Sequence, residues 1–354
     1  MSALGLLQNI VRERRRQVAM PRFLTFIVTF TCNARCIMCD SWKKPSPDDL
    51  SVAEIENIFE QLPRMDAVRL TGGEPFVRRD LPQIAKLVQH KLQPVALHIT
   101  TNGFLTDRIV EFCETREKTT PLQLLISVDG LRSKHNHVRG RDSAWDSVMR
   151  TISALAPRRD ELRLNIAVNQ TIVDAQGASD YPKLRDHLAQ WGVKNQVVMA
   201  YDASATYSVE DEVEVAPGEV GSFATFGDFN EQQIIELLDE VERDIESYPP
   251  AERAAKRYYL RGIRNRLLHC KGAPNPPCVA LGSHMRLFPN GDVPTCQFNT
   301  RKVGNLRRQL FEQVWFGEDI EPQRRWVRNC PGCWAECEVL PSALYTGDLF
   351  AHGL

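Results

Sequence analysis

The organisation of this chain is set by residues 23–39, which read FLTFIVTFTCNARCIMC. The first half is rich in β-branched and aromatic residues, and this predicts a buried strand over residues 22–29. The second half is a loop that carries Cys32, Cys36 and Cys39 in the spacing Cys-x3-Cys-x2-Cys. Three thiolates on one loop can ligate three corners of an iron–sulfur cube and leave its fourth iron open to a small molecule. The alternatives at this point are a zinc site and three unligated thiols.

Strand and helix signals alternate after this first strand. Apolar runs predict further strands at residues 67–71, 95–100, 122–128, 162–168 and 196–200. Helical periodicity predicts helices that begin at the Ser51–Glu54 capping box and at Ser143, and others near residues 81–88, 109–113 and 181–191. Six strand–helix units in a row imply an α/β fold with a parallel sheet, open or curled into a partial (β/α)6 TIM-like barrel. Active sites of such folds lie at the carboxyl ends of the strands.

The composition is that of an ordinary globular protein. The chain has 354 residues, 43% of them hydrophobic, and a formal net charge of -1. This balance creates no field that would attract nucleic acid, so we expect no nucleic-acid partner. The longest apolar run is too short for a transmembrane span, and the N-terminal basic residues follow the apolar ones, unlike those of a signal peptide. We therefore expect a cytoplasmic protein whose ten cysteines stay reduced and bind metal or take part in catalysis.

A second motif, Gly72-Gly73-Glu74-Pro75, follows the second predicted strand. The glycines would let a ligand approach the backbone, and the Glu74 carboxylate could accept a hydrogen bond from an ammonium group. Together with the cysteine loop, this motif makes residues 23–200 resemble the radical S-adenosylmethionine (SAM) superfamily. The fold of that family is a partial six-unit barrel, in agreement with the strand count.

The resemblance implies the cofactors and the first chemical step. Cys32, Cys36 and Cys39 would hold a [4Fe-4S] cluster, and the amine and carboxylate of SAM would bind its open iron. One electron from the reduced cluster would cleave SAM into methionine and a 5'-deoxyadenosyl radical, which abstracts hydrogen from a substrate C–H bond. A flavodoxin-type or ferredoxin-type protein is the expected reductant.

The resemblance also implies which residues bind SAM. The expected contacts are Gly72, Gly73 and Glu74 for the amino group, Ser127 and Arg139 for the ribose or carboxylate, and Asn102 close by. Asp129 and Asn169 are expected at the same mouth of the barrel, although polar residues at strand ends also serve in turns. Met38 departs from the family pattern, which often has an aromatic residue at this position.

Six more cysteines lie in the C-terminal third: Cys270, Cys278, Cys296, Cys330, Cys333 and Cys337. Asn290-Gly291 predicts a hairpin between the second and third of these cysteines. Residues 278–337 resemble the auxiliary-cluster domains of radical SAM enzymes, called SPASM and, in a shorter form, twitch. This resemblance implies one auxiliary [4Fe-4S] cluster with four ligands among the last five cysteines, and a structural zinc remains the alternative. Which of Cys330, Cys333 and Cys337 is spare stays open; Cys270 is expected to be a spare thiol and Cys113 a core residue.

These features predict an N-terminal helix (1–20), a radical SAM partial barrel (21–230), linker helices (231–269) and a SPASM/twitch-like domain (270–354). The acidic segment 203–230 is predicted to be a loop over the site or a linker. The charge of residues 210–219 within it could favour a cationic substrate, although a solvated loop is the favoured interpretation.

The expected substrate is a small biosynthetic metabolite, because only about 20 residues precede the barrel and leave no room for a peptide-recognition domain. The alternative is a maturase that modifies a ribosomal peptide or protein. A second alternative, a non-catalytic iron–sulfur or zinc protein, is disfavoured by Gly72-Gly73-Glu74-Pro75, which an electron carrier does not need.

Overall fold

Six of the seven strands in the main sheet follow one another in chain order. The computed structural model describes residues 3–44, 48–201, 204–217, 229–268 and 275–352. Within this part of the chain the sheet has the order β6-β5-β4-β3-β2-β1-β7, with every pair parallel. The strands are β1 (Phe23–Thr29), β2 (Ala67–Gly72), β3 (Ala96–Thr101), β4 (Leu122–Ser127), β5 (Leu164–Ile172), β6 (Lys194–Met199) and β7 (His284–Leu287). Because β6 and β7 are opposite edges of the sheet, the barrel is partial, which confirms the predicted fold class.

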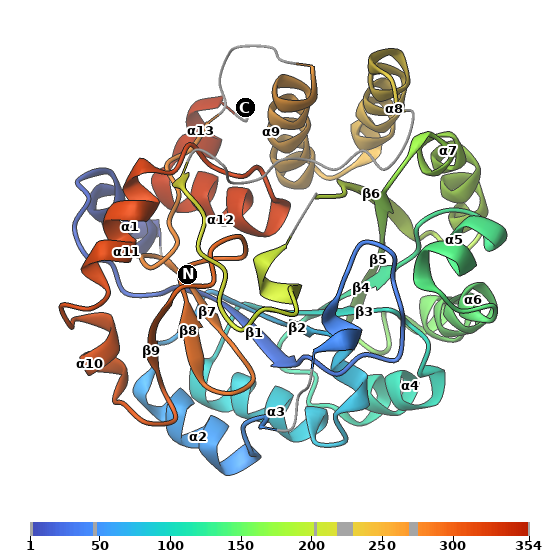
Figure 1. The fold of residues 1–354 in the computed structure, drawn as a ribbon. Coiled ribbons are helices and arrows are strands. Elements are labelled where there is room, and N and C mark those ends of the chain that lie inside the picture. The colour runs from blue at the N-terminus through green and yellow to red at the C-terminus, as the bar shows by residue number, and fades with distance from the viewer. Residues whose placement is uncertain (1–2, 45–47, 202–203, 218–228, 269–274, 353–354) are drawn as a thin grey trace.

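Helices cover the outer face of the sheet, and two late helices lie across its inner side (Figure 1). The helices that follow successive strands lie outside the sheet, whereas α9 and α12 lie on the inner side. The helices are α1 (Ala3–Arg14), α2 (Val52–Gln61), α3 (Leu81–Leu87), α4 (Thr106–Thr115), α5 (Arg132–Arg139), α6 (Ala144–Leu155), α7 (Ala175–Ala189), α8 (Glu231–Asp244), α9 (Pro250–Leu267), α10 (Phe311–Trp315), α11 (Glu321–Asn329), α12 (Glu336–Thr346) and α13 (Asp348–His352). None of these described helices is long and apolar enough to cross a membrane.

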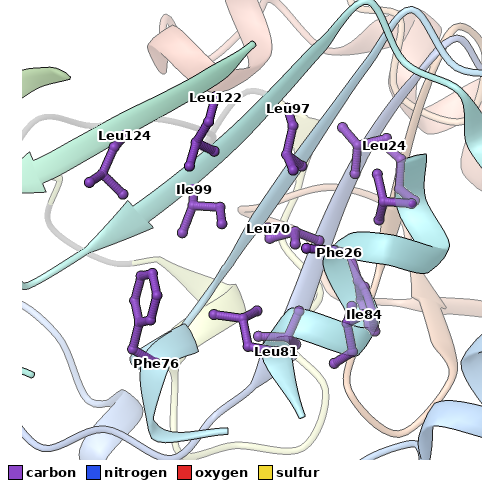
Figure 2. Packing of buried hydrophobic residues seen from close by; sticks show 14 of the residues in the cluster. Leu24, Phe26, Leu70, Phe76, Leu81, Ile84, Leu97, Ile99, Leu122 and Leu124 are labelled. Carbon is purple, nitrogen blue, oxygen red and sulfur yellow. The ribbon is translucent and has the colours of Figure 1, made fainter. Parts of the chain in front are cut away.

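The main core lies between the sheet and the outer helices. Side chains on a strand alternate between the two faces, and burial alternates accordingly along β2, β3 and β4. Figure 2 shows the buried face, where Leu70, Ile99 and Leu124 of successive strands lie in one layer and Ile84 of α3 lies close to Leu70. Cys113 of α4 is fully buried in this cluster, as predicted. The other face of these strands is free to line the interior of the barrel.

Two predicted helix caps had different outcomes. The Ser51 hydroxyl accepts a hydrogen bond from the Glu54 amide at 3.3 Å, and the Ser51 amide donates to the Glu54 carboxylate at 2.8 Å. The capping box is therefore confirmed. Ser143 stands at the start of α6 but does not cap it, because its hydroxyl instead accepts a hydrogen bond from Arg141 Nε at 3.0 Å.

The hairpin predicted around Asn290-Gly291 is present as a turn, although the strands on its two sides belong to different sheets. The Gly291 amide donates to the Phe288 carbonyl at 3.0 Å, and the Phe288 amide donates to the Asp292 carbonyl at 2.9 Å. However, β7 pairs in parallel with β1, and β8 (Asp292–Pro294) pairs with β9 (Lys302–Asn305). A four-residue strand from the C-terminal segment thus completes the sheet of the barrel. The predicted domain boundaries stay predictions.

The predicted N-terminal helix is present as α1 and packs on the C-terminal segment. Asn9 Nδ2 donates to Ser283 Oγ at 2.6 Å, and Arg14 Nε donates to the Thr346 carbonyl at 2.6 Å. Both ends of the described chain therefore meet on the same side of the barrel.

Helix α9 depends on a glycine for its contact with the cysteine-rich segment. A Cβ at Gly262 would lie 1.6 Å from Cζ2 of the buried Trp334 ring. We therefore expect Gly262→Ala to lower the free energy of unfolding by about 1–3 kcal/mol, because the ring must move. The matched control is Gly177→Ala in α7, where the nearest atom would be 3.6 Å from the new Cβ. The control should be neutral or stabilising by up to about 1 kcal/mol in urea unfolding; equal stability of the two variants would contradict the expectation.

Candidate functional site

The loop after β1 brings Cys32, Cys36 and Cys39 to one cavity of about 150 Å³. The cavity lies at the carboxyl ends of the first four strands. Its other walls are Ala34, Met38, Ser41, Trp42, Thr71, Gly72, Gly73, Thr100, Thr101, Asn102, Ser127, Arg139 and Tyr207. The structure therefore brings together the three thiols and five of the six predicted SAM contacts at one site.

Each of the three sulfurs has an N–H group directed at it. The Ala34 amide lies 3.5 Å from Cys32 Sγ, the Ser41 amide 3.5 Å from Cys39 Sγ, and Arg139 Nη1 3.5 Å from Cys36 Sγ. Burial raises the pKa of Cys32 to about 12 and that of Cys39 to about 11. N–H donors around buried sulfurs stabilise thiolate ligands, so these residues fit a [4Fe-4S] cluster.

The last turn of α5 holds the cysteine loop in place. The Arg35 amide donates to the Arg139 carbonyl, and the Ile37 amide donates to the Val138 carbonyl, both at 3.0 Å. Gly140 ends the helix with a φ of +61°, and a Cβ there would lie 2.5 Å from the Arg35 carbonyl oxygen. The end of a helix is thus fitted against the loop without room for a side chain.

The glycines of the second motif allow two backbones to meet. A Cβ at Gly72 would lie 2.3 Å from the Thr29 carbonyl oxygen, and one at Gly73 would lie 2.3 Å from the Thr31 carbonyl oxygen. Gly72 also has a φ of +152°. The close approach that requires these glycines is therefore between the end of β2 and the base of the cysteine loop. This differs from the predicted reason, the approach of a ligand, although both glycines do line the cavity.

Glu74 is buried behind the cavity and does not line it. Its carboxylate accepts hydrogen bonds from Thr101 Oγ1 at 2.7 Å, from the Asn102 amide at 2.6 Å and from the Phe76 amide at 3.1 Å. Burial raises its pKa to about 7 in spite of these donors. Within the described chain, Glu74 thus ties the end of β2 to the end of β3.

Arg139 and Asp129 form a buried ion pair beside the cluster loop. The Nε–Oδ2 distance is 2.5 Å and the Nη2–Oδ1 distance is 2.9 Å. Burial alone would lower the pKa of Arg139, but the Asp129 carboxylate raises it overall. Asp129 therefore fixes the guanidinium beside Cys36 and does not itself face the cavity.

The remaining polar residues predicted at the mouth occupy different places. Asn102 Nδ2 donates to Asn33 Oδ1 at 2.7 Å and lies 4.0 Å from Cys32 Sγ. Ser127 lines the cavity at the end of β4. Asn169 lines instead a larger cavity of about 500 Å³ in the barrel interior, which also reaches Thr100.

The last five cysteines gather in one partly buried cluster in the C-terminal segment. Four of them accept a hydrogen bond from the backbone amide two residues ahead, the pairs being Cys278 with Ala280, Cys296 with Phe298, Cys330 with Gly332 and Cys333 with Ala335. Cys337 is different, because its Sγ donates to Gln297 Oε1 at 2.9 Å and it faces the larger cavity. The first four thus share the sulfur environment of Cys32 and Cys39. Cys270 lies outside the described residues.

Sequence analysis missed Tyr207, which lies in a short 3-10 helix, Ala205–Tyr207, within the acidic segment. Its side chain lines the small cavity, and burial raises its pKa to about 12. A single aromatic residue in a poorly periodic segment carried no signal for this position.

Two carboxylates of the acidic segment are already paired within the chain, and the expectation of a cationic substrate stays a prediction for the others. Asp211 pairs with Lys302 at 2.6 Å and Glu212 pairs with Arg301 at 2.7 Å. These charges join the segment to the C-terminal part of the chain. The described part of the segment is therefore a bridge beside the site.

Family models match two parts of the chain. Residues 26–166 match the radical SAM superfamily, and residues 278–337 match the iron-sulfur cluster-binding domain SPASM.

Curated relatives cover a part of the chain. Fe-coproporphyrin III synthase of Methanosarcina barkeri is 26% identical over 167 residues, which are 46% of this chain and 40% of that protein. GTP 3',8-cyclase of Synechocystis sp. is 29% identical over 180 residues, 49% of this chain and 53% of that protein. The chain thus spans about half the length of the curated relatives that it matches.

Solved structures of other proteins share the fold over most of this chain. Streptococcus suis SuiB bound to S-adenosylmethionine has a TM-score of 0.60 and 16% identity, and covers 87% of this chain and 68% of its own. The protein anSMEcpe with bound AdoMet has a TM-score of 0.58 and 14% identity, and covers 85% and 82%. The matched domains, the fold and the two cysteine sets agree: the chain belongs to the radical SAM superfamily and carries a C-terminal SPASM-type iron–sulfur domain.

Proposed function

We propose that this protein abstracts hydrogen from a substrate held in the barrel interior, between a SAM-binding cluster and an auxiliary cluster. The observation that carries the proposal is the position of the 500 Å³ cavity. It shares Thr100 with the cavity of Cys32, Cys36 and Cys39, and Cys337 of the C-terminal segment lines its wall. A substrate in this space would be next to both cysteine sets.

Cys32, Cys36 and Cys39 would hold the [4Fe-4S] cluster that binds SAM. When bound, this group supplies the electron that cleaves SAM and releases the 5'-deoxyadenosyl radical. The protein holds the reactants and excludes water. Arg139, fixed by Asp129, places a positive charge at Cys36, and the neutral Tyr207 phenol closes one wall of the cavity.

We infer that Cys278, Cys296, Cys330 and Cys333 ligate the auxiliary [4Fe-4S] cluster and that Cys337 is the spare thiol. The backbone amides at the first four sulfurs support this choice, because such donors stabilise cluster thiolates. The Cys337 thiol is already engaged with Gln297. If the substrate radical passed one electron to this cluster and released one proton, the overall reaction would be a two-electron oxidation of the substrate.

The substrate we favour is a small metabolite. A cavity of about 500 Å³ lies within the usual range for small-molecule sites. A peptide substrate is the second candidate, because SuiB, which shares the fold, has also been crystallised bound to a precursor peptide, SuiA.

The ligand assignment predicts the iron content of two variants. Cys333→Ala should lower the reconstituted protein from about eight to about four irons per chain, because it removes an auxiliary ligand. Cys337→Ala, four residues away, should keep about eight. Iron and sulfide analysis after anaerobic reconstitution measures both. Loss of iron in Cys337→Ala, with retention in Cys333→Ala, would reverse the assignment.

The reaction itself is tested by SAM cleavage. With dithionite, the reconstituted protein should convert SAM into 5'-deoxyadenosine, measured by chromatography. The combined variant Cys32→Ala, Cys36→Ala and Cys39→Ala should form none, yet keep about four irons in the auxiliary site. If the fully reconstituted wild type forms no 5'-deoxyadenosine, the proposed function is wrong. Zinc in the triple variant would instead refute the auxiliary iron–sulfur cluster.

A further inference from the structure

A row of polar side chains crosses the inner face of the sheet. The strand register pairs Arg69 of β2 with His98 of β3, His98 with Gln123 of β4, and Gln123 with Asn165 of β5. All four residues line the 500 Å³ cavity, and we call them the polar row. The interiors of parallel barrels are usually filled by branched apolar side chains, so this layer departs from the rule.

Within the part of the chain that the structure describes, no side chain of the polar row forms a hydrogen bond or an ion pair with a protein group. The Nε atom of Arg69 is buried and has no acceptor there. The guanidinium lies 5.5 Å from the centroid of the Phe23 ring, which contributes no negative charge. The row is otherwise accessible from the cavity, since Arg69, His98 and Gln123 are half-buried and Asn165 is exposed. A guanidinium with a buried donor and no counter-ion is costly, and this indicates a missing anionic partner at Arg69.

The other described charges that line this cavity are already neutralised. Lys256 pairs with Glu336 and also donates to Gln196 Oε1 at 3.1 Å. Glu252 pairs with Lys194 at 2.6 Å. Arg69 is therefore the charge of the described lining that lacks a counter-ion.

The neighbours of Arg69 in the row do not supply that counter-ion. Burial, and then the Arg69 charge, lower the pKa of His98 to about 3, so its imidazole is neutral and offers one donor and one acceptor. Gln123 and Asn165 offer amide groups. Cys337 lies on the same cavity, but its Sγ is the donor in its contact with Gln297.

We propose that the polar row binds an anionic group of the substrate, with Arg69 as the counter-ion to a carboxylate or a phosphate. Both groups match the fork of guanidinium donors, and the uncharged neighbours can satisfy the remaining oxygens. This inference rests on the proposed function, because it assigns part of the substrate cavity.

The position of the polar row determines which end of the bound substrate would face SAM. Arg69 is two residues before Thr71, which lines the SAM-site cavity, and His98 is two residues before Thr100, which lines both cavities. At about 3.3 Å per residue, the anion would be held about 7 Å from that level along the strands. The anionic end would thus lie deep in the barrel, and the C–H bond would be directed toward SAM.

Anion binding to the reconstituted protein with SAM tests the proposal. The probes are inorganic phosphate and acetate, titrated separately by calorimetry at low ionic strength. The wild type should bind at least one of them, and Arg69→Gln should weaken that binding tenfold or more. Arg69→Lys keeps the charge without the fork and should be intermediate. The matched control, Arg64→Gln, removes the same charge from an exposed position just before β2 and should bind like the wild type.

Each outcome decides the matter. Preference for phosphate or for acetate identifies the anionic group, whereas no binding to the wild type, or equal binding to Arg69→Gln, overturns the proposal. Thermal unfolding separates a structural role, since loss of the Phe23 contact alone would lower the melting temperature and leave anion affinity unchanged. Formation of 5'-deoxyadenosine without substrate should be the same in the control Arg64→Gln and in the wild type. Its absence from both would refute the proposed function, while the anion titration would still report on Arg69.

Discussion

The close contact between the end of β2 and the base of the cysteine loop is the constraint on which the site depends. The Gly73 amide donates to the Thr29 carbonyl at 2.8 Å, and the Glu74 amide donates to the Thr31 carbonyl at 2.9 Å. This spacing leaves no room for a Cβ at Gly73. A loop with three candidate cluster ligands must be rigid, because cluster geometry tolerates little displacement of the sulfurs. Backbone hydrogen bonds from the neighbouring strand provide that rigidity without long side chains.

Further hydrogen bonds of buried groups connect this contact to β3 and to the cysteine loop. Glu74 fastens β3 to β2 through Thr101 and Asn102, and Asn102 in turn contacts the cysteine loop through Asn33. On the other side, the last turn of α5 accepts hydrogen bonds from the loop. The three thiols are thus held from β2, from β3 and from α5. Loss of any one anchor would leave the other two to position the loop.

The sequence contained enough information for the first six strands because each carries either an apolar run or a regular alternation of apolar residues. It also identified the three thiols of the cysteine loop, since these stand close together in the chain. It was insufficient for β7, because four residues beside an Asn-Gly turn resemble one arm of a hairpin. The ion pairs of Asp211 and Glu212 join residues about ninety positions apart, and no local pattern reports such a contact. The sequence also left open which of the last cysteines is the spare thiol, because the direction of the Cys337 side chain depends on the packing of α12.

The division of the sheet into an apolar and a polar face connects the fold to the chemistry. One residue in two on each strand packs against the outer helices, and this face alone accounts for the main core. The other half of the strand residues is therefore released from the need to be apolar. In a closed barrel they would meet one another and be selected for packing. In this partial barrel they face a cavity instead, so a guanidinium, an imidazole and two amides can occupy one layer. Because the barrel is incomplete, this layer borders open space, and that space is where the anionic group we propose would bind.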